Sequence, residues 1–86
     1  MEVTVKILNR TGLHARPAAL LAKLANQFQS DIRIVGDHAA DAKSILDLLS
    51  LGAGAGTELQ VSASGSDEQA AIEAIQTLFA GKFKED

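Results

Sequence analysis

The sequence predicts an α+β fold in which a four-stranded antiparallel sheet is covered on one face by three helices. Two observations lead to this class. Segments with an apolar residue at every second position alternate with segments where apolar residues recur every three or four positions, giving the order β-α-β-β-α-β-α. Each segment is apolar on one side only, which is typical of two packed layers.

The first half of the chain supplies two strands and a helix. Residues 3–7 alternate apolar and polar, which predicts a half-buried strand. The only proline, Pro17, suits the first turn of a helix that starts near His14 and Ala15. The inward face of that helix is expected to carry Ala18, Leu21, Ala22, Ala25 and Phe28. Residues 32–35 predict the second strand.

The middle of the chain contains the weakest strand. We assign residues 39–42 as a strand, although alanine has poor β propensity. Ser44 and Asp47 have the spacing of a capping pair for a short helix that runs to about Ser50. The glycines between residues 52 and 56 end that helix.

A strand and a helix complete the predicted order. Residues 59–63 alternate apolar and polar, and Ser66 with Gln69 has the form of a capping box before the last helix. That helix is expected to bury Ala71, Ile72, Ile75, Leu78 and Phe79. Residues 1–86 are therefore expected to form a single domain.

Composition excludes several classes of function. The net charge is −3 and only 3% of residues are aromatic, so neither a basic surface for duplex nucleic acid nor a stacking surface for single strands is expected. The chain has no cysteine, and we expect no metal and no cofactor. No apolar run approaches the roughly 18–20 residues of a membrane span, and the first residues lack a signal-peptide pattern. We therefore expect a cytoplasmic protein with no membrane insertion.

The segment His14–Pro17 combines three groups suited to phosphoryl chemistry. Neutral imidazole is a nucleophile, and a helix N-terminus binds anions through its unpaired N–H groups and its dipole. Arg16 adds a planar cation that matches phosphate oxygens. Taken alone, the four residues favour a plainer interpretation, in which His14 caps a helix and Arg16 is solvated. The nearest carboxylates in sequence, Glu2 and Asp31, are distant, which weakly favours a carrier over a hydrolase.

The wider context favours phosphoryl chemistry. Residues 11–18, Thr-Gly-Leu-His-Ala-Arg-Pro-Ala, closely resemble the active-site motif of the HPr family, the histidine phosphocarriers of the bacterial phosphoenolpyruvate-dependent phosphotransferase system. Residues 43–46 with 49–52 resemble the second signature of that family, and residues 65–70 match the segment before its last helix. The fold of the family, an open-faced β-sandwich of four antiparallel strands and three helices, agrees with the predicted element order.

The resemblance implies a role for each residue of the motif. His14 would accept a phosphoryl group on Nδ1 from phospho-enzyme I and pass it to enzyme II A domains for sugar uptake and its regulation. Arg16 would neutralise the phosphoryl oxygens, and the backbone N–H groups of Ala15 and Arg16 would complete the anion site. The protein would be a stoichiometric carrier and not an enzyme. His38, in a turn without a motif, is expected to be a surface residue.

The resemblance also implies a docking surface and a regulatory site. The surface would consist of Ala19, Leu20, Ile45, Leu46 and Leu49. Residues 45–51 are too apolar for one buried stripe, so some of these side chains should be exposed. Ser44 matches the serine that an HPr kinase/phosphorylase modifies in some bacteria, and it also suits the role of helix cap. Asp47 departs from the family and would repel a phosphate on Ser44.

An alternative function concerns the branch of the pathway. Residues 78–86 resemble the tail of the nitrogen-branch paralogue of HPr, whereas residues 43–52 are more similar to sugar-branch proteins. A nitrogen-branch carrier, or a purely regulatory paralogue that acts through Ser44 and the second helix, is therefore the alternative. A generic domain without phosphate chemistry would require all the segment matches to be accidental.

Overall fold

The computed structural model describes residues 1–85 and has the predicted order of elements. The strands are β1 (Glu2–Lys6), β2 (Asp31–Val35), β3 (Ala39–Asp41) and β4 (Glu58–Ser64). The helices are α1 (Ala15–Ala25), α2 (Ile45–Ser50) and α3 (Glu68–Ala80), followed by a short helical turn, η1 (Lys82–Lys84). The weakest predicted strand, built largely of alanine, is therefore present as β3.

The four strands form one antiparallel sheet in the order β1-β4-β2-β3. The register pairs Val5 with Leu59 and Ile34 with Val61, so apolar side chains collect on one face. Gln60 and Arg33 lie between these positions and are exposed on the other face. The predicted open-faced α+β sandwich is confirmed, because one face of the sheet carries the core and the other faces solvent.

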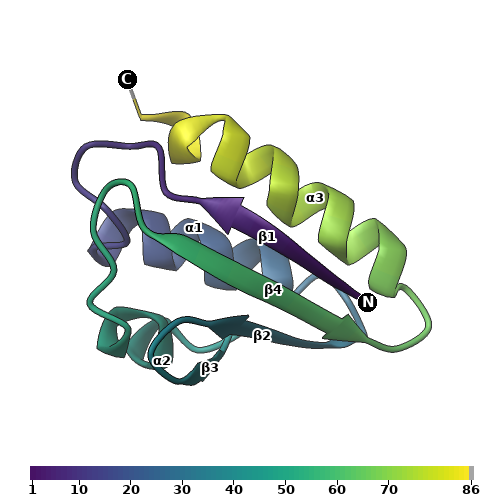
Figure 1. Ribbon diagram of the computed structural model, residues 1–86. Coiled ribbons are helices and arrows are strands. Elements are labelled where there is room, and N and C mark those ends of the chain that lie inside the picture. The colour runs from purple at the N-terminus through teal and green to yellow at the C-terminus, as the bar shows by residue number, and fades with distance from the viewer. Residues whose placement is uncertain (86) are drawn as a thin grey trace.

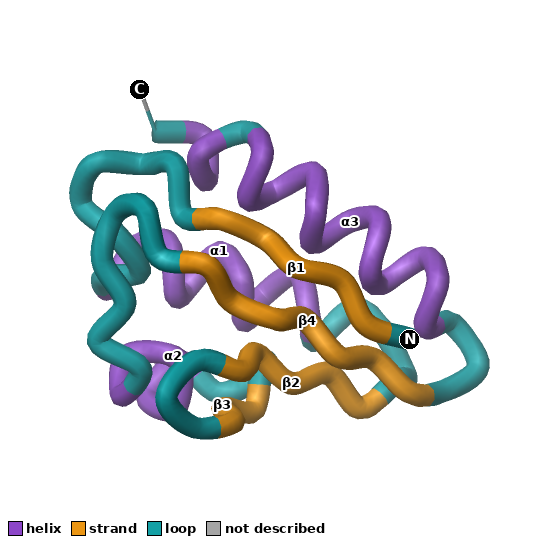
Figure 2. Tube along the Cα trace, viewed as in Figure 1, coloured by secondary structure: helices purple, strands orange, loops and turns teal. Residues whose placement is uncertain are grey.

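The helices lie on the apolar face of the sheet. In Figure 1, α1 runs behind the strands, α3 runs alongside β1, and α2 lies at the end of the sheet beside β3; Figure 2 shows the same arrangement by element type. The packing buries Leu21 of α1, Leu48 of α2 and Ile75 of α3 almost completely. The helices therefore close the core from one side.

Three details of the predicted helices are wrong. Phe28, expected on the inward face of the first helix, lies beyond the end of α1 and is only partly buried, because Asn26 caps the helix by donating hydrogen bonds to the Ala22 carbonyl. The N-cap of α3 is Asp67 rather than Ser66, and it makes no side-chain capping bond because its carboxylate accepts hydrogen bonds from Gln29 and Ser30. The predicted capping box is therefore not formed. Leu78 is only partly buried, because it lines an open groove between α3 and α1.

Two loops meet at one end of the sheet and position the N-terminus of α1. The backbone N–H of Leu13 donates to the carbonyl of Ala53 at 2.9 Å, which joins the loop after β1 to the loop before β4. Gly12 has φ +72°, and a Cβ there would lie 2.7 Å from the Ala53 carbonyl oxygen. Only glycine fits this close approach. The turn that follows α3 reaches the same end of the molecule (Figure 1).

Candidate functional site at the N-terminus of helix α1

His14 is the N-cap residue of α1. Its backbone is extended (φ −90°, ψ −167°), and its carbonyl accepts the first intrahelical hydrogen bond from Ala18 at 2.9 Å. The imidazole makes no capping hydrogen bond and its side chain is 43% exposed. The local geometry therefore leaves the ring accessible to a partner and does not use it to hold the helix.

The first turn of α1 supplies the expected anion-binding groups. Within residues 1–85, the N–H groups of Ala15 and Arg16 have no hydrogen-bond partner, and Pro17 at the third helical position has no N–H. No acidic residue occupies this turn. Arg16 is exposed, and no carboxylate of the described residues pairs with its guanidinium. The two residues that follow His14 thus supply two open N–H donors and one cation.

A carboxylate that sequence reasoning missed lies against the imidazole. Glu85 Oε2 is 3.3 Å from His14 Nε2, although the two residues are 71 positions apart. The other carboxylate oxygen accepts hydrogen bonds from Thr11 Oγ1 at 2.9 Å and Asn9 Nδ2 at 3.1 Å. The Glu85 side chain is only 14% exposed. Distance along the chain to Glu2 and Asp31 was therefore a poor guide to the charges around His14.

The turn after α3 brings Glu85 to this position. Lys82, Phe83 and Lys84 all have left-handed backbone, with φ between +54° and +61°, which is rare for residues other than glycine. Phe83 is fully buried and contacts Phe79 edge to face, with ring centroids 4.7 Å apart. Burial of this ring holds the turn, and the turn reverses the chain toward the His14 loop.

Hydrogen bonding keeps Glu85 ionised. The pKa of its carboxyl group lies below the ordinary value because Thr11 donates to it, with further donation from Asn9 and an attractive contact with His14, while burial acts in the opposite direction. Asn9 is fully buried, and its Nδ2 also donates to the Gly12 carbonyl at 2.8 Å. This amide therefore links the tail carboxylate to the loop that carries His14.

The predicted docking residues have different exposures. Leu46 is 78% exposed, and Ile45 and Leu49 are also exposed for large apolar side chains. The expectation that some apolar residues of α2 are exposed is confirmed. Ala19 is exposed and Leu20 is half-buried, both on α1. Helices α1 and α2 are in contact, and Figure 1 shows α2 and the N-terminal end of α1 at the same end of the sheet.

Ser44 is the N-cap of α2, as predicted. Its Oγ accepts the backbone N–H of Asp47 at 3.2 Å. The Asp47 carboxylate accepts the N–H of Asp41 at 3.2 Å, so it braces the loop between β3 and α2. His38 is exposed and its Nε2 lies 2.9 Å from Ser50 Oγ, which agrees with its assignment as a surface residue.

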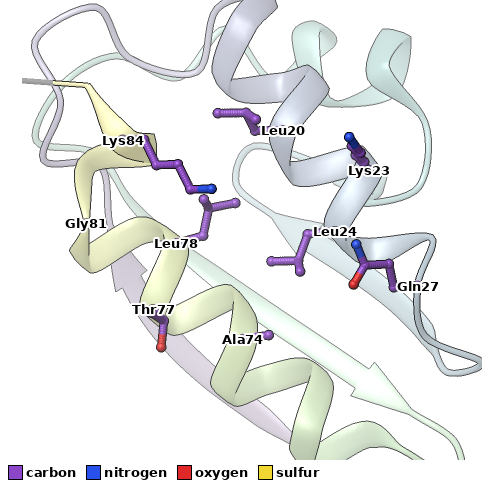
Figure 3. A pocket seen from close by; sticks show the side chains of 9 residues that line it. All are labelled: Leu20, Lys23, Leu24, Gln27, Ala74, Thr77, Leu78, Gly81 and Lys84. Atoms are coloured by element: carbon purple, nitrogen blue, oxygen red, sulfur yellow. The ribbon is translucent and has the colours of Figure 1, made fainter.

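A groove of about 550 Å³ separates α1 from α3 (Figure 3). Leu20, Leu24 and Leu78 line it, and the side chain of Lys84 points into it from the tail. No imidazole or carboxylate is among the described residues that line this groove. Elsewhere among residues 1–85, no three acidic or histidine side chains gather where they could hold a metal ion. None of the described helices has both the length and the apolar character to cross a bilayer.

A small α+β fold that presents an accessible imidazole, two open N–H groups and an arginine at one helix end defines a class of proteins suited to carry a phosphoryl group. The family model for the PTS HPr component phosphorylation site matches residues 1–81. The phosphocarrier protein HPr of Treponema pallidum is 48% identical, covering 96% of each chain. The phosphocarrier protein NPr of Shewanella violacea is 44% identical over 99% of this chain and 94% of its own.

Structure comparison gives the same family. The crystal structure of HPr-C-His from Thermoanaerobacter tengcongensis superposes with a TM-score of 0.96 and 46% identity, covering 100% of this chain and 98% of the other. The chain belongs to the PTS HPr family. It is therefore a phosphocarrier of the phosphotransferase system, and proteins of this family interact with the enzymes of that system.

Proposed function

We propose that His14 is the residue that carries the phosphoryl group, that phospho-enzyme I supplies it and that enzyme II A domains accept it. The accessible ring at the open N-terminus of α1 is the observation that carries the proposal. The Nδ1 lone pair bonds to phosphorus as the bond between phosphorus and the donor breaks. The N–H groups of Ala15 and Arg16 and the guanidinium of Arg16 stabilise the three phosphoryl oxygens.

In this proposal, residues 1–86 form one carrier domain that acts in the cytoplasm. The protein carries the phosphoryl group stoichiometrically and does not catalyse a reaction of its own. A hydrolase needs a base that activates water. The carboxylate that contacts His14, Glu85, also accepts hydrogen bonds from Thr11 and Asn9. This arrangement supports a carrier, because Glu85 is committed to the ring and its loop.

The test is phosphorylation by enzyme I with phosphoenolpyruvate and Mg²⁺. The parent protein should acquire acid-labile, alkali-stable phosphate, and His14→Ala should acquire none. His38→Ala is the matched control, because His38 is the only other histidine and is also exposed. It should be labelled at the parent rate. Labelling of His14→Ala at the parent level would disprove the assignment.

The nitrogen branch is a second candidate, because two relatives named NPr, 44% and 42% identical, match over 99% and 95% of this chain. Phosphorylated protein should be mixed separately with a sugar-branch and a nitrogen-branch enzyme II A domain. Faster transfer to the sugar-branch domain supports the main proposal. Faster transfer to the nitrogen-branch domain assigns the chain to the alternative.

Docking is proposed to use the exposed apolar side chains of α2 with Ala19 and Leu20. Leu46→Asp should weaken transfer to enzyme II A without loss of stability, because Leu46 is largely exposed.

Ser44 is the proposed site for an HPr kinase/phosphorylase, and phosphate there would lie beside this surface. A purely regulatory paralogue would instead keep its partner in His14→Ala and change affinity in Ser44→Asp.

A further inference from the structure

The tail carboxylate forms part of the His14 environment, and nothing in the phosphorylation motif specifies it. Glu85 lies 3.3 Å from His14 Nε2, on the side of the ring opposite Nδ1. Its other oxygen is held by Asn9 and Thr11, both in the loop that precedes His14. The carboxylate is therefore fixed to the loop that carries the ring.

We propose that Glu85 is a positioning residue for His14. Its carboxylate accepts the Nε2–H of the neutral ring, leaves the lone pair on Nδ1, and offsets the positive charge that the ring gains when Nδ1 bonds to phosphorus. This proposal rests on the proposed role of His14 as the phosphoryl acceptor. It adds a residue, outside the motif, that sets which ring nitrogen reacts.

The geometry shows that the contact is built into the site. Asn9 is fully buried, and its Nδ2 donates to both Glu85 and the Gly12 carbonyl, while its Oδ1 has no partner among residues 1–85. The opposite amide orientation would place an oxygen against two acceptors. The buried Asn9 side chain is therefore oriented with its NH₂ group toward two acceptors, the Gly12 carbonyl and the Glu85 carboxylate.

The anchoring of the tail supports the same conclusion. Left-handed backbone at Lys82, Phe83 and Lys84 is costly, and the burial of Phe83 against Phe79 holds it. Lys84 also lines the groove between α3 and α1 (Figure 3). Glu85 is thus delivered by a packed turn. Its lowered pKa, caused first by the Thr11 hydroxyl, keeps it an ionised acceptor at neutral pH.

In this proposal, the two ring nitrogens have different partners: the Glu85 carboxylate at Nε2 and the phosphoryl group at Nδ1. An ionised carboxylate that accepts Nε2–H favours the tautomer in which Nδ1 is unprotonated. When the N–P bond forms, the ring keeps its Nε2 proton and becomes a phosphoimidazolium. When the acceptor attacks phosphorus, the bonding electrons return to Nδ1. Glu85 faces the cationic edge of the ring, and Arg16 with the helix N-terminus faces the phosphoryl group.

The experiment compares ring ¹⁵N spectra and phosphorylation rates in the full chain. At pH 8, where histidine is ordinarily neutral, the parent should show a protonated Nε2 and an unprotonated Nδ1. In Glu85→Ala, the two ¹⁵N shifts should approach each other as both tautomers become populated. The rate of phosphorylation by enzyme I should fall roughly tenfold. Glu85→Gln keeps an acceptor but loses the charge, so it should lose rate with a smaller change in the spectra.

Glu73→Gln is the control, because it removes one exposed carboxylate from α3 away from the site. It should match the parent in both measurements. The proposal is overturned if Glu85→Ala keeps the parent spectrum, or if its rate stays within twofold of the parent. Labelling of His14→Ala would instead overturn the proposed function, and the ring spectra would still report whether Glu85 sets the tautomer.

Discussion

Asp67 and Glu85 lie at opposite ends of α3, and each is a carboxylate that binds three donor groups. Asp67 accepts the backbone N–H groups of Gln29 and Ser30 at 2.8 and 3.0 Å and the Ser30 hydroxyl at 2.5 Å. Glu85 accepts from Thr11 and Asn9 and contacts the His14 ring. In both residues, hydrogen bonding lowers the carboxyl pKa, chiefly through the Ser30 hydroxyl at Asp67 and the Thr11 hydroxyl at Glu85.

The two sites differ in what their donors can do. The donors to Asp67 are amides and a hydroxyl, none of which changes charge near neutral pH, and Ser30 is buried. One partner of Glu85 is an imidazole that is 43% exposed and can gain a proton or a phosphoryl group. The same carboxylate arrangement therefore ties loops together at one end of α3 and supports a reactive ring at the other.

The largest expected effect is that of Phe83→Ala at the reactive end. Removal of a fully buried ring should lower the free energy of unfolding by about 3 kcal/mol, measured by urea denaturation. It should also release Glu85 and reduce the phosphorylation rate to that of Glu85→Ala. Lys82→Ala is the control, because Lys82 is exposed in the same turn. A parent-like rate in Phe83→Ala would show that the turn does not position Glu85.

Two glycines allow a matched test of both ends. A Cβ at Gly12 would lie 2.7 Å from Ala53 O, and a Cβ at Gly65 would lie 2.7 Å from Ser30 Cα. Each change to alanine should cost about 2 kcal/mol of unfolding free energy, because each also has positive φ. Only Gly12→Ala should slow phosphorylation. Gly54→Ala, with open space around the position, should change neither quantity.

If Gly65→Ala slowed phosphorylation as much as Gly12→Ala, the two ends of α3 would not have the separate roles described above. The effect would then follow general stability and not the His14 loop. Thermal melts of both variants should be recorded beside the rates. Equal melting temperatures with unequal rates would confirm that the two ends have separate roles.

The sequence allowed His14, Arg16 and Pro17 to be predicted because they are contiguous and their chemistry depends on one helix end. The strands were predictable because alternation records which face is buried, and even β3 was found in spite of its alanines. The exposure of α2 followed from the excess of apolar residues over one buried stripe. These features are local, so short stretches of sequence contain the information that specifies them.

Glu85 and Asp67 were missed for the opposite reason. Glu85 contacts partners 71 to 76 positions away, and its approach depends on a left-handed turn that contains no glycine to signal it. The side chain of Asp67 crosses to residues 37 and 38 positions away, so local spacing favoured Ser66 as the cap. Neither contact can be inferred before the packing of α3 on the sheet is known.

The smallest expected effects concern the pH dependence of stability at the two carboxylates. Folding lowers the pKa of each carboxyl group from its ordinary value, which is 3.8 for Asp67 and 4.5 for Glu85. At a pH above that ordinary value, each ionised carboxylate therefore stabilises the folded protein. That stabilisation is lost as the pH falls through the folded pKa. Asp67→Asn and Glu85→Gln should each lower the melting temperature by a few degrees between pH 6 and 7.

The difference in melting temperature between each variant and the parent should become smaller at acid pH. As the pH falls, this change should begin at a higher pH for Glu85→Gln than for Asp67→Asn. Glu73→Gln should show no such pH-dependent difference, because the Glu73 carboxylate is exposed and accepts a hydrogen bond from the exposed Gln69 side chain at 3.3 Å. A melting-temperature difference for Asp67→Asn that stayed constant down to pH 2 would mean that the Asp67 charge does not stabilise the junction. The three hydrogen bonds to Asp67 would then stabilise the fold without a contribution from its charge. Asp67 and Glu85 would share a hydrogen-bonding geometry, but the charge would matter only at Glu85.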